Sequence, residues 1–323
     1  MKNSFFASLV LLVSMPVHAL VGGVADLNTT DSPWAGVGAV SVNGGTFSGA
    51  LIDSQYVLTA AHVVGGQVST PGNVSFTLNA GGAASHVIAA ASIVVFPGFT
   101  GTTPGPDKVW HDDLALIRLA APVDSSVSSY GLYDGTLDGK ILTLVGYGAS
   151  GDGKNGISSS ANPNVKRVGQ NRVDVLHKDD DGGSASEVFV FDFDGGDATS
   201  NVFGNPIPRN LTLGADIEAQ FAGGDSGSPV FVKVGNAWKI AGIATFNGST
   251  SLSSASNVLF GSIGGGTVVA PYLPWITSTL AAPVPELHVW LMLLVGMGLV
   301  GATRLRFQSG RYIKTIGRTA YIN

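Results

Sequence analysis

The 323-residue length allows one or two domains and is ample for a hydrophobic core. The absence of cysteine excludes disulfides, thiol nucleophiles and thiolate metal sites, while 45 glycines and only 12% charged residues are typical of a β-rich chain with many turns. Between residues 20 and 280, 11 Lys and Arg stand against 21 Asp and Glu, and this acidic balance argues against nucleic acid as a partner.

Residues 1–19 have the pattern of a secretory signal peptide. Lys2 precedes an apolar run, Phe5–Met15, and Val17-His18-Ala19 supplies small residues at a cleavage position. The alternative, a membrane-spanning or buried helix, is disfavoured because the run is too short to cross a bilayer. We expect an exported protein whose mature chain begins at Leu20.

The middle of the chain is predicted to be strands and turns. Short runs rich in β-branched and aromatic residues are separated by Gly, Asn, Asp and Pro, which predicts a β-sandwich or β-barrel. Residues 149–184 are instead rich in Gly, Ser, Asn and Asp and are expected to form a long surface insertion. The predicted strands are 37–42, 56–58, 74–78, 86–96, 114–119 and 141–145.

The segment Asp192–Asp197 alternates carboxylates with other residues, as some Ca²⁺-binding loops do. It lacks the full ligand spacing of a helix–loop–helix calcium site. We therefore interpret it as a solvated acidic turn, and the sequence predicts no metal site.

Three short segments together indicate acyl transfer. They are Leu58–His62, Asp113–Leu116 and Gly224–Pro229, and they supply a histidine, an aspartate and a serine in that chain order. A serine nucleophile needs an adjacent base, and that base needs a carboxylate to hold its tautomer. Asp112 is the neighbouring alternative to Asp113.

These segments resemble those of chymotrypsin-like serine proteases of the trypsin family, over residues 20–280. Further similarity lies in 47–57, in 242–246 and in 267–276. The resemblance implies an all-β fold of two six-stranded antiparallel β-barrels with a short C-terminal helix. It also implies hydrolysis of a protein or peptide substrate with no cofactor.

Site roles follow from this resemblance, residue by residue. Ser226 is expected to be the nucleophile, His62 the general base and Asp113 the residue that orients it. The N–H groups of Gly224 and Ser226 are expected to form the oxyanion hole. Ser228 stands where the family commonly has glycine, which does not alter these three groups.

The start Leu20-Val21-Gly22-Gly23 resembles the amino terminus of active family members. There the free α-ammonium pairs with the aspartate before the catalytic serine, which is Asp225 here. Signal peptidase itself would then produce the active terminus. The alternative is an ordinary mature start with coincidental glycines.

Specificity is expected to depend on Gln220, at the base of the primary pocket, and on Thr245, Phe246 and Asn247 along the cleft wall. Glutamine does not give the Arg/Lys preference that aspartate gives at this position, so uncharged or polar side chains are expected. Glu218 would bring a carboxylate near the pocket if its loop were displaced.

The C-terminal segment, 281–323, resembles the PEP-CTERM sorting signal of Gram-negative bacteria. Pro283–Glu286 precedes an apolar run, Val289–Ala302, followed by Arg304 and Arg306. The resemblance implies processing by an exosortase-type enzyme, membrane contact through 287–306 and placement at the cell surface, periplasm or extracellular matrix. A plain membrane anchor is the alternative, although the apolar run is short for one.

Together these patterns favour an exported serine endopeptidase. A non-catalytic surface binding module on the same fold remains the alternative. An esterase on another fold is disfavoured, because the order of the three groups differs and Ser228 breaks the Gly-x-Ser-x-Gly motif.

Overall fold

The computed structural model describes residues 20–29, 31–78, 86–101, 107, 109–197, 199–203, 211–248 and 257–282. The chain divides into a large unit, Met1–Thr277, and a second unit, Ser278–Asn323. The predicted signal peptide and the predicted sorting signal beyond residue 282 lie outside the described residues. Within the described part of the chain, no helix has both the length and the apolar character needed to cross a membrane.

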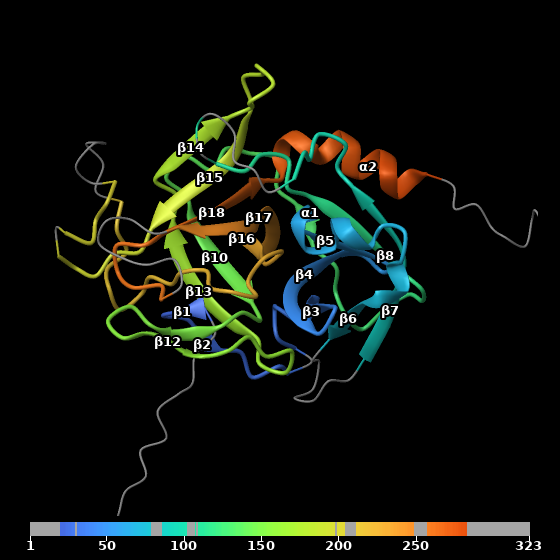
Figure 1. Cartoon of the computed structure of the whole chain (residues 1–323), viewed down its shortest axis with the longest axis horizontal. Coiled ribbons are helices and arrows are strands. Elements are labelled where there is room, and N and C mark those ends of the chain that lie inside the picture. Colours follow the sequence, from blue (N-terminus) through green and yellow to red (C-terminus); the bar gives the residue numbers. More distant parts are fainter. Residues whose placement is uncertain are drawn as a thin grey trace, which may run out of the picture. The chain divides into compact units, whose positions relative to one another are not determined.

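Six strands form a closed antiparallel barrel in the order β3-β4-β5-β8-β7-β6, drawn in blue and teal in Figure 1. Asn43 and Gly44 connect β3 to β4 with positive φ angles of 51° and 81°, as a two-residue hairpin turn requires. The barrel closes where β3 pairs with β6, with Val40 opposite Phe76. The strands are β3 (Val37–Val42), β4 (Gly45–Asp53), β5 (Tyr56–Thr59), β6 (Val74–Leu78), β7 (His86–Val95) and β8 (Ala115–Leu119).

The other half of the large unit is a nine-stranded sheet beside the barrel, drawn from green to orange in Figure 1 except for the blue β2. Its main path runs β14-β15-β18-β17-β16-β10-β13-β2, and β9 pairs in parallel with β17. Its core contains fully buried side chains such as Leu144, Phe189, Phe191 and Val230. The strands are β2 (Val24–Ala25), β9 (Gly131–Leu132), β10 (Ile141–Gly146), β13 (Arg167–Arg172), β14 (Val175–Lys178), β15 (Ser186–Asp192), β16 (Pro229–Val234), β17 (Ala237–Gly248) and β18 (Ile263–Val268).

The prediction of two closed barrels therefore holds for one of them. In the second half, the strand pairing among the described residues does not form a closed ring. Between β13 and β15, side-chain hydrogen bonds stand in place of strand pairing. Asn171 Nδ2 donates to the carbonyls of Asp192 (2.9 Å) and Ala219 (3.0 Å). Asp192 N–H in turn donates to Asp174 Oδ2 at 3.2 Å. The seam is thus held by an amide and a carboxylate rather than by a backbone ladder.

The expected surface insertion over 149–184 is wrong for its middle part. Strand β13 pairs with β10 over six residues, and the strand is interior because Arg167 and Asn171 are buried. Its polar sequence concealed this position. The beginning of the segment joins the chain start in a small sheet of β1 (Leu20–Val21), β11 (Ser150–Asp152) and β12 (Gly156–Ser159).

Short helices follow one strand of each half. After β5 come α1 (Ala61–Val64), η1 (Gly65–Gln67) and η2 (Pro71–Asn73), and after β18 come η3 (Ala270–Tyr272) and the predicted C-terminal helix, α2 (Leu273–Ala281). Phe96 lies edge-on to Tyr272 and Trp275, with ring centroids 4.8 Å and 5.3 Å away. Phe96 N–H also donates to the Leu114 carbonyl at 2.9 Å. This contact fastens the beginning of α2 to the segment that carries Asp113.

Candidate active site

His62 lies in α1 and Asp113 lies in the segment before β8, and their side chains form a close pair. Asp113 Oδ2 lies 2.6 Å from His62 Nδ1, and Asp113 Oδ1 accepts the His62 backbone N–H at 2.8 Å. The Asp113 side chain is 2% exposed, whereas that of His62 is 19% exposed. A buried carboxylate that holds both the ring and the backbone fixes the imidazole orientation and the tautomer with hydrogen on Nδ1. Nε2 is then left as the basic nitrogen.

Asp112, the alternative to Asp113, points to a different partner. Tyr272 donates its hydroxyl to Asp112 Oδ1 at 2.8 Å. The positive φ of Asp112, 59°, turns the backbone so that these adjacent carboxylates serve different contacts. Burial raises the pKa of Asp112. Asp113 is therefore the carboxylate that the structure brings to His62.

Ser226 lies in the loop before β16 and is held against the first barrel. Ser48 N–H donates to the Ser226 carbonyl at 3.0 Å. The neighbouring Gly227 has a φ of 83°, and a Cβ there would lie 2.2 Å from both the Ser48 carbonyl oxygen and Thr59 Oγ1. Because Thr59 precedes His62 by three residues, this close backbone packing sets the serine loop beside the histidine helix.

The backbone around Ser226 leaves donors available. Within the described part of the chain, the N–H groups of Gly224 and Ser226 donate no hydrogen bond. Gly224 has a φ of 97°, a conformation that glycine adopts without strain. Its carbonyl accepts from Ser48 Oγ at 3.3 Å, so the Gly224 peptide is also anchored to β4. Two free N–H groups beside a serine side chain are an arrangement that can bind an oxyanion.

A small pocket of about 80 Å³ adjoins Ser226. Thr245, Phe246 and Asn247 from β17 line it, and so does Phe221 from the segment before Ser226. Asn247 Nδ2 donates to the Phe221 carbonyl at 3.2 Å and so connects the two segments. Because a water molecule occupies about 30 Å³, the pocket has room only for a small side chain.

Gln220 does not line this pocket, contrary to its predicted place. Its side chain is completely buried and its Oε1 accepts the Phe221 N–H at 2.7 Å. Its Nε2 has no hydrogen-bond partner within the described residues. Phe221 and Asn247 line the pocket in its place. The position of Gln220 in the family pattern does not predict this difference.

Glu218 supplies no carboxylate to the pocket either. Its Oε1 accepts the Leu213 N–H at 2.7 Å and its Oε2 accepts the Asp194 N–H at 2.6 Å. Burial raises the pKa of Glu218 to about 7. These contacts commit the side chain to a structural role in the loop that precedes the site.

The expectation of a solvated acidic turn at Asp192–Asp197 is correct only at its end. Asp197 is exposed and accepts backbone N–H groups of Thr199 and Ser200. Asp192 and Asp194, by contrast, are 2% and 3% exposed. Burial raises the pKa of both, to about 6 for Asp194. The end of β15 and the residues after it, Phe191–Asp194, are all buried, so both carboxylates lie in the interior.

Asp225 is completely buried beside the serine. Its oxygens accept the N–H groups of Gly148 (2.9 Å) and Ala222 (3.0 Å). Burial raises its pKa to about 7, although the charge of Arg167 opposes that shift. Among the described residues, no hydrogen bond or ion pair joins Asp225 to Leu20, whose nitrogen is an uncharged amide in the full chain because Ala19 precedes it.

Leu20 and Val21, at the expected start of the mature chain, nevertheless lie in the same region. Leu20 and Val21 are fully buried, and Val21 exchanges two backbone hydrogen bonds with Gln220, at 3.0 Å and 2.9 Å. Leu20 pairs with Ser150, two residues beyond the Gly148 that binds Asp225. The segment 148–150 therefore contacts both members of the predicted Leu20–Asp225 pair.

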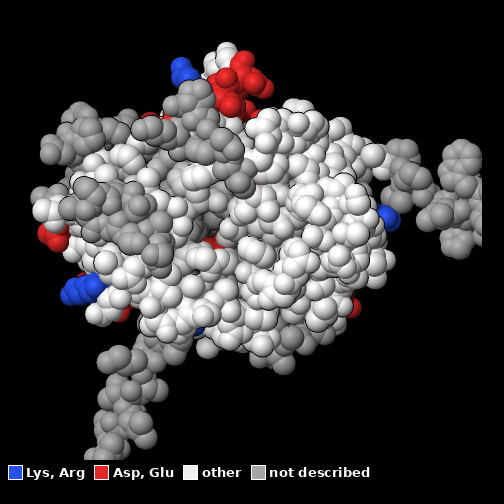
Figure 2. All heavy atoms as spheres, in the orientation of Figure 1, with Lys and Arg blue, Asp and Glu red and all other residues white. Residues whose placement is uncertain are grey.

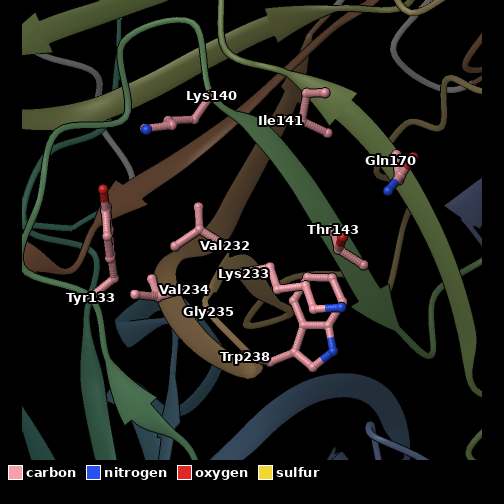
Figure 3. Close-up of a pocket in the computed structure, with 10 residues that line it drawn as sticks. All are labelled: Tyr133, Lys140, Ile141, Thr143, Gln170, Val232, Lys233, Val234, Gly235 and Trp238. Carbon is pink, nitrogen blue, oxygen red and sulfur yellow. The ribbon is translucent and has the colours of Figure 1, made fainter.

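Sequence reasoning missed the residues that join the halves. Ser48, Thr59 and Tyr272 lie in segments that resemble the family, but no role is assigned to them from the sequence, because they bind backbone or a neighbouring carboxylate rather than substrate. A cavity of about 640 Å³, lined by residues of strands such as β10 and β16, contains none of the predicted site residues. Figure 3 shows its lining, including Lys140, Lys233 and Trp238.

Comparison with known proteins agrees with this geometry. A search of curated proteins finds no match. The sequence profile of the family described as Trypsin matches residues 21–276, which include His62, Asp113 and Ser226. The chain belongs to the trypsin family.

Proposed function

We propose that the protein is a serine endopeptidase in which His62, Asp113 and Ser226 form the catalytic triad. The observation that carries this proposal is the paired contact of Asp113 with the ring and backbone of His62. Membership of the trypsin family makes a serine peptidase the expected activity. No metal or organic cofactor is required for this chemistry.

The proposed reaction follows from the tautomer of His62. Nε2 accepts the proton of Ser226 Oγ as that oxygen attacks the substrate carbonyl. The N–H groups of Gly224 and Ser226 bind the oxyanion, each contributing on the order of 10²–10³ in rate. His62 then passes the proton to the leaving amine. Water, activated by the same nitrogen, hydrolyses the acyl-enzyme.

The proposed substrate is a polypeptide cleaved after a small, uncharged residue such as alanine. The pocket of about 80 Å³ beside Ser226 supports this preference, since the Asn247–Phe221 hydrogen bond limits its size. Among its lining residues, Asp225 is the one that bears a carboxylate, and the backbone of Gly148 and Ala222 occupies its oxygens. The pocket therefore offers little to an arginine or lysine side chain.

Export and activation are proposed from the sequence. Cleavage after Ala19 would create an α-ammonium on Leu20, near the segment that binds Asp225. A buried carboxylate gains most from such a partner. The C-terminal segment would direct the protein to the cell surface, either by exosortase-type processing or as an anchor. An intact mass that begins anywhere but Leu20 would contradict this activation route.

Peptide hydrolysis tests the proposed function. Casein is digested with the exported protein, and the cleavage sites are mapped by mass spectrometry. We expect new termini after Ala, Gly or Ser, and their loss in Ser226→Ala but not in Ser69→Ala, which changes an exposed serine elsewhere. A folded protein that binds casein without cleaving it would instead favour the non-catalytic binding module.

A further inference from the structure

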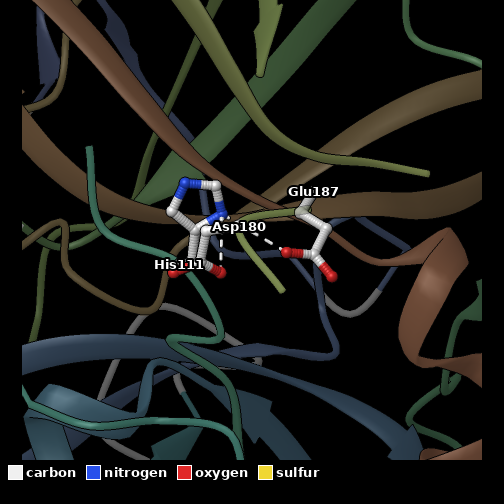
Figure 4. A group of neighbouring side chains, drawn as sticks. All are labelled: His111, Asp180 and Glu187. Atoms are coloured by element: carbon white, nitrogen blue, oxygen red, sulfur yellow. Dashed lines mark hydrogen bonds and ion pairs between the residues drawn. The ribbon is translucent and has the colours of Figure 1, made fainter. Parts of the chain in front are cut away.

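A second group of ionisable side chains lies beside the cleft, where the segment before β8 meets the β14–β15 hairpin. Glu187 Oε2 lies 3.3 Å from His111 Nδ1, and Asp180 Oδ1 lies 3.6 Å from the same nitrogen. Figure 4 shows both carboxylates directed at that nitrogen. The His111 side chain is 4% exposed and that of Glu187 is 10% exposed. The mechanism proposed above uses none of these groups.

The two nitrogen–oxygen distances match the spacing of neighbouring ligand atoms around a bound metal ion. Zn²⁺ binds His nitrogen and carboxylate oxygen at about 2.0–2.2 Å, so neighbouring ligands of a tetrahedron lie about 3.3–3.6 Å apart. All three ligand atoms here lie within 4.8 Å of one another. We propose that His111, Asp180 and Glu187 form a Zn²⁺ site with one position left for water.

The other side of the imidazole supports this assignment. His111 Nε2 lies 3.1 Å from Asp107 Oδ2, which also lies 3.0 Å from His177 Nδ1. A histidine that binds a metal through one nitrogen commonly donates the other N–H to a carboxylate, which fixes its tautomer. Asp107 occupies that position. A neutral His111 has one N–H for carboxylates on both sides, so its Nδ1 faces oxygen lone pairs unless a cation lies between them.

The ligand types favour zinc over calcium. Imidazole is a common ligand of Zn²⁺ and its neighbours in the first transition row, whereas Ca²⁺ takes six to eight oxygen ligands. A proton on Nδ1 is the competing way to satisfy the two carboxylates. The two alternatives differ in one measurable property, which is zinc binding, because a histidine that keeps both ring protons cannot bind zinc.

The site would fasten a loop of the cleft. Trp110, adjacent to His111, packs against Phe246 of the cleft wall with ring centroids 5.2 Å apart. Asp180 belongs to the acidic tip of the β14–β15 hairpin, where Figure 2 shows acidic side chains gathered at the top of the molecule. A metal shared by His111 and the hairpin therefore connects that tip to the wall of the substrate cleft.

Zinc binding to the full chain tests the proposal, in a Ser226→Ala background so that no peptidase activity is needed. Titration calorimetry is expected to give one Zn²⁺ per chain, with no competition from excess Ca²⁺. His111→Gln and Glu187→Gln are each expected to weaken binding by at least about tenfold. The matched control is His86→Gln, which changes an exposed histidine on β7. X-ray absorption should show nitrogen and oxygen ligands near 2.0–2.1 Å.

Three results would overturn the site. They are no zinc binding by a folded chain, equal binding by the His111→Gln chain, and loss of binding in His62→Gln rather than in His111→Gln. Thermal unfolding without metal shows whether each variant folds. Because these readouts do not involve hydrolysis, failure of the zinc site leaves the proposed peptidase unaffected, and the reverse also holds.

Discussion

The two β-halves of the molecule are held together in different ways. The first barrel closes through continuous backbone pairing, and its buried polar side chains include neutral Ser48, Thr59 and Thr77. The nine-stranded sheet depends at one seam on Asn171 and Asp174, and burial raises the pKa of several carboxyl groups in this half. The half that carries Ser226 and its pocket is thus the one in which more of the stability depends on buried carboxyl groups.

The largest expected effect concerns the carboxylate at the junction of the halves. Asp113→Asn removes the charge that stabilises the imidazolium and favours the wrong tautomer of His62. We expect kcat/KM for peptide hydrolysis to fall about 10⁴-fold. Asp112→Asn, which changes the neighbour bound to Tyr272, is expected to reduce kcat/KM by less than about tenfold. Equal losses in the two variants would contradict the assignment of Asp113.

Two glycines with nearly the same φ separate crowding from backbone conformation. Gly227→Ala at 83° meets the Ser48 carbonyl and Thr59, and we expect it to reduce the free energy of unfolding by about 2–4 kcal/mol. Gly44→Ala at 81° meets nothing within 4 Å, so only the conformational cost of about 1–2 kcal/mol remains. Urea unfolding measures both. If the two losses are equal, the close contact between the halves is unimportant.

Widening the pocket tests whether the second half determines which side chain is accepted at the cleaved position. Asn247→Gly removes the side chain that connects β17 to Phe221. We expect the ratio of kcat/KM for leucine over alanine at the cleaved position to rise by about 10–100-fold. The peptides are otherwise identical. An unchanged ratio would show that another group limits the pocket.

The smallest expected effect is on pH-dependent stability. Burial raises the pKa of Asp174 and of Asp192, and raises that of Glu218 to about 7. Unfolded carboxyl groups ionise near pH 4, so between pH 4 and about 7 the folded state holds more protons. The free energy of unfolding should therefore fall as pH rises through this range.

Substitution locates this pH dependence in the second half. Asp174→Asn keeps an acceptor for the Asp192 N–H but cannot ionise, so the fall should become shallower. Asp124→Asn changes an exposed group whose pKa is lowered by a hydrogen bond from Ser126, and should leave the slope between pH 5 and 8 unchanged. Urea unfolding at several pH values provides the measurement. A slope that Asp174→Asn does not reduce would contradict this account.

The same contrast explains what the sequence could predict. In the first barrel, short runs of β-branched and aromatic residues between turn residues predict the strands 37–42 and 74–78 where they are observed, because local pattern and backbone pairing agree. Motif spacing also identifies His62, Asp113 and Ser226. Each lies in a local context that depends on few distant residues.

In the second half, polar composition misled the prediction. The Gly, Ser, Asn and Asp content of 149–184 predicts a surface insertion, yet Arg167 and Asn171 of β13 within it are buried. The depth of the pocket depends on a hydrogen bond between Asn247 and Phe221, which are 26 residues apart. The carboxylates at His111 Nδ1, those of Asp180 and Glu187, come from the β14–β15 hairpin, far away in the sequence. Such contacts have no local sequence signal.

The most direct test of the central claim is covalent labelling by a fluorophosphonate, with the adduct located by peptide mass mapping. It is performed on exported protein whose intact mass shows that it begins at Leu20. The account predicts one adduct, on Ser226, that is absent from His62→Ala and retained in His86→Ala. A folded protein that forms no adduct, or forms it on another serine, would contradict Ser226 as a nucleophile activated by His62.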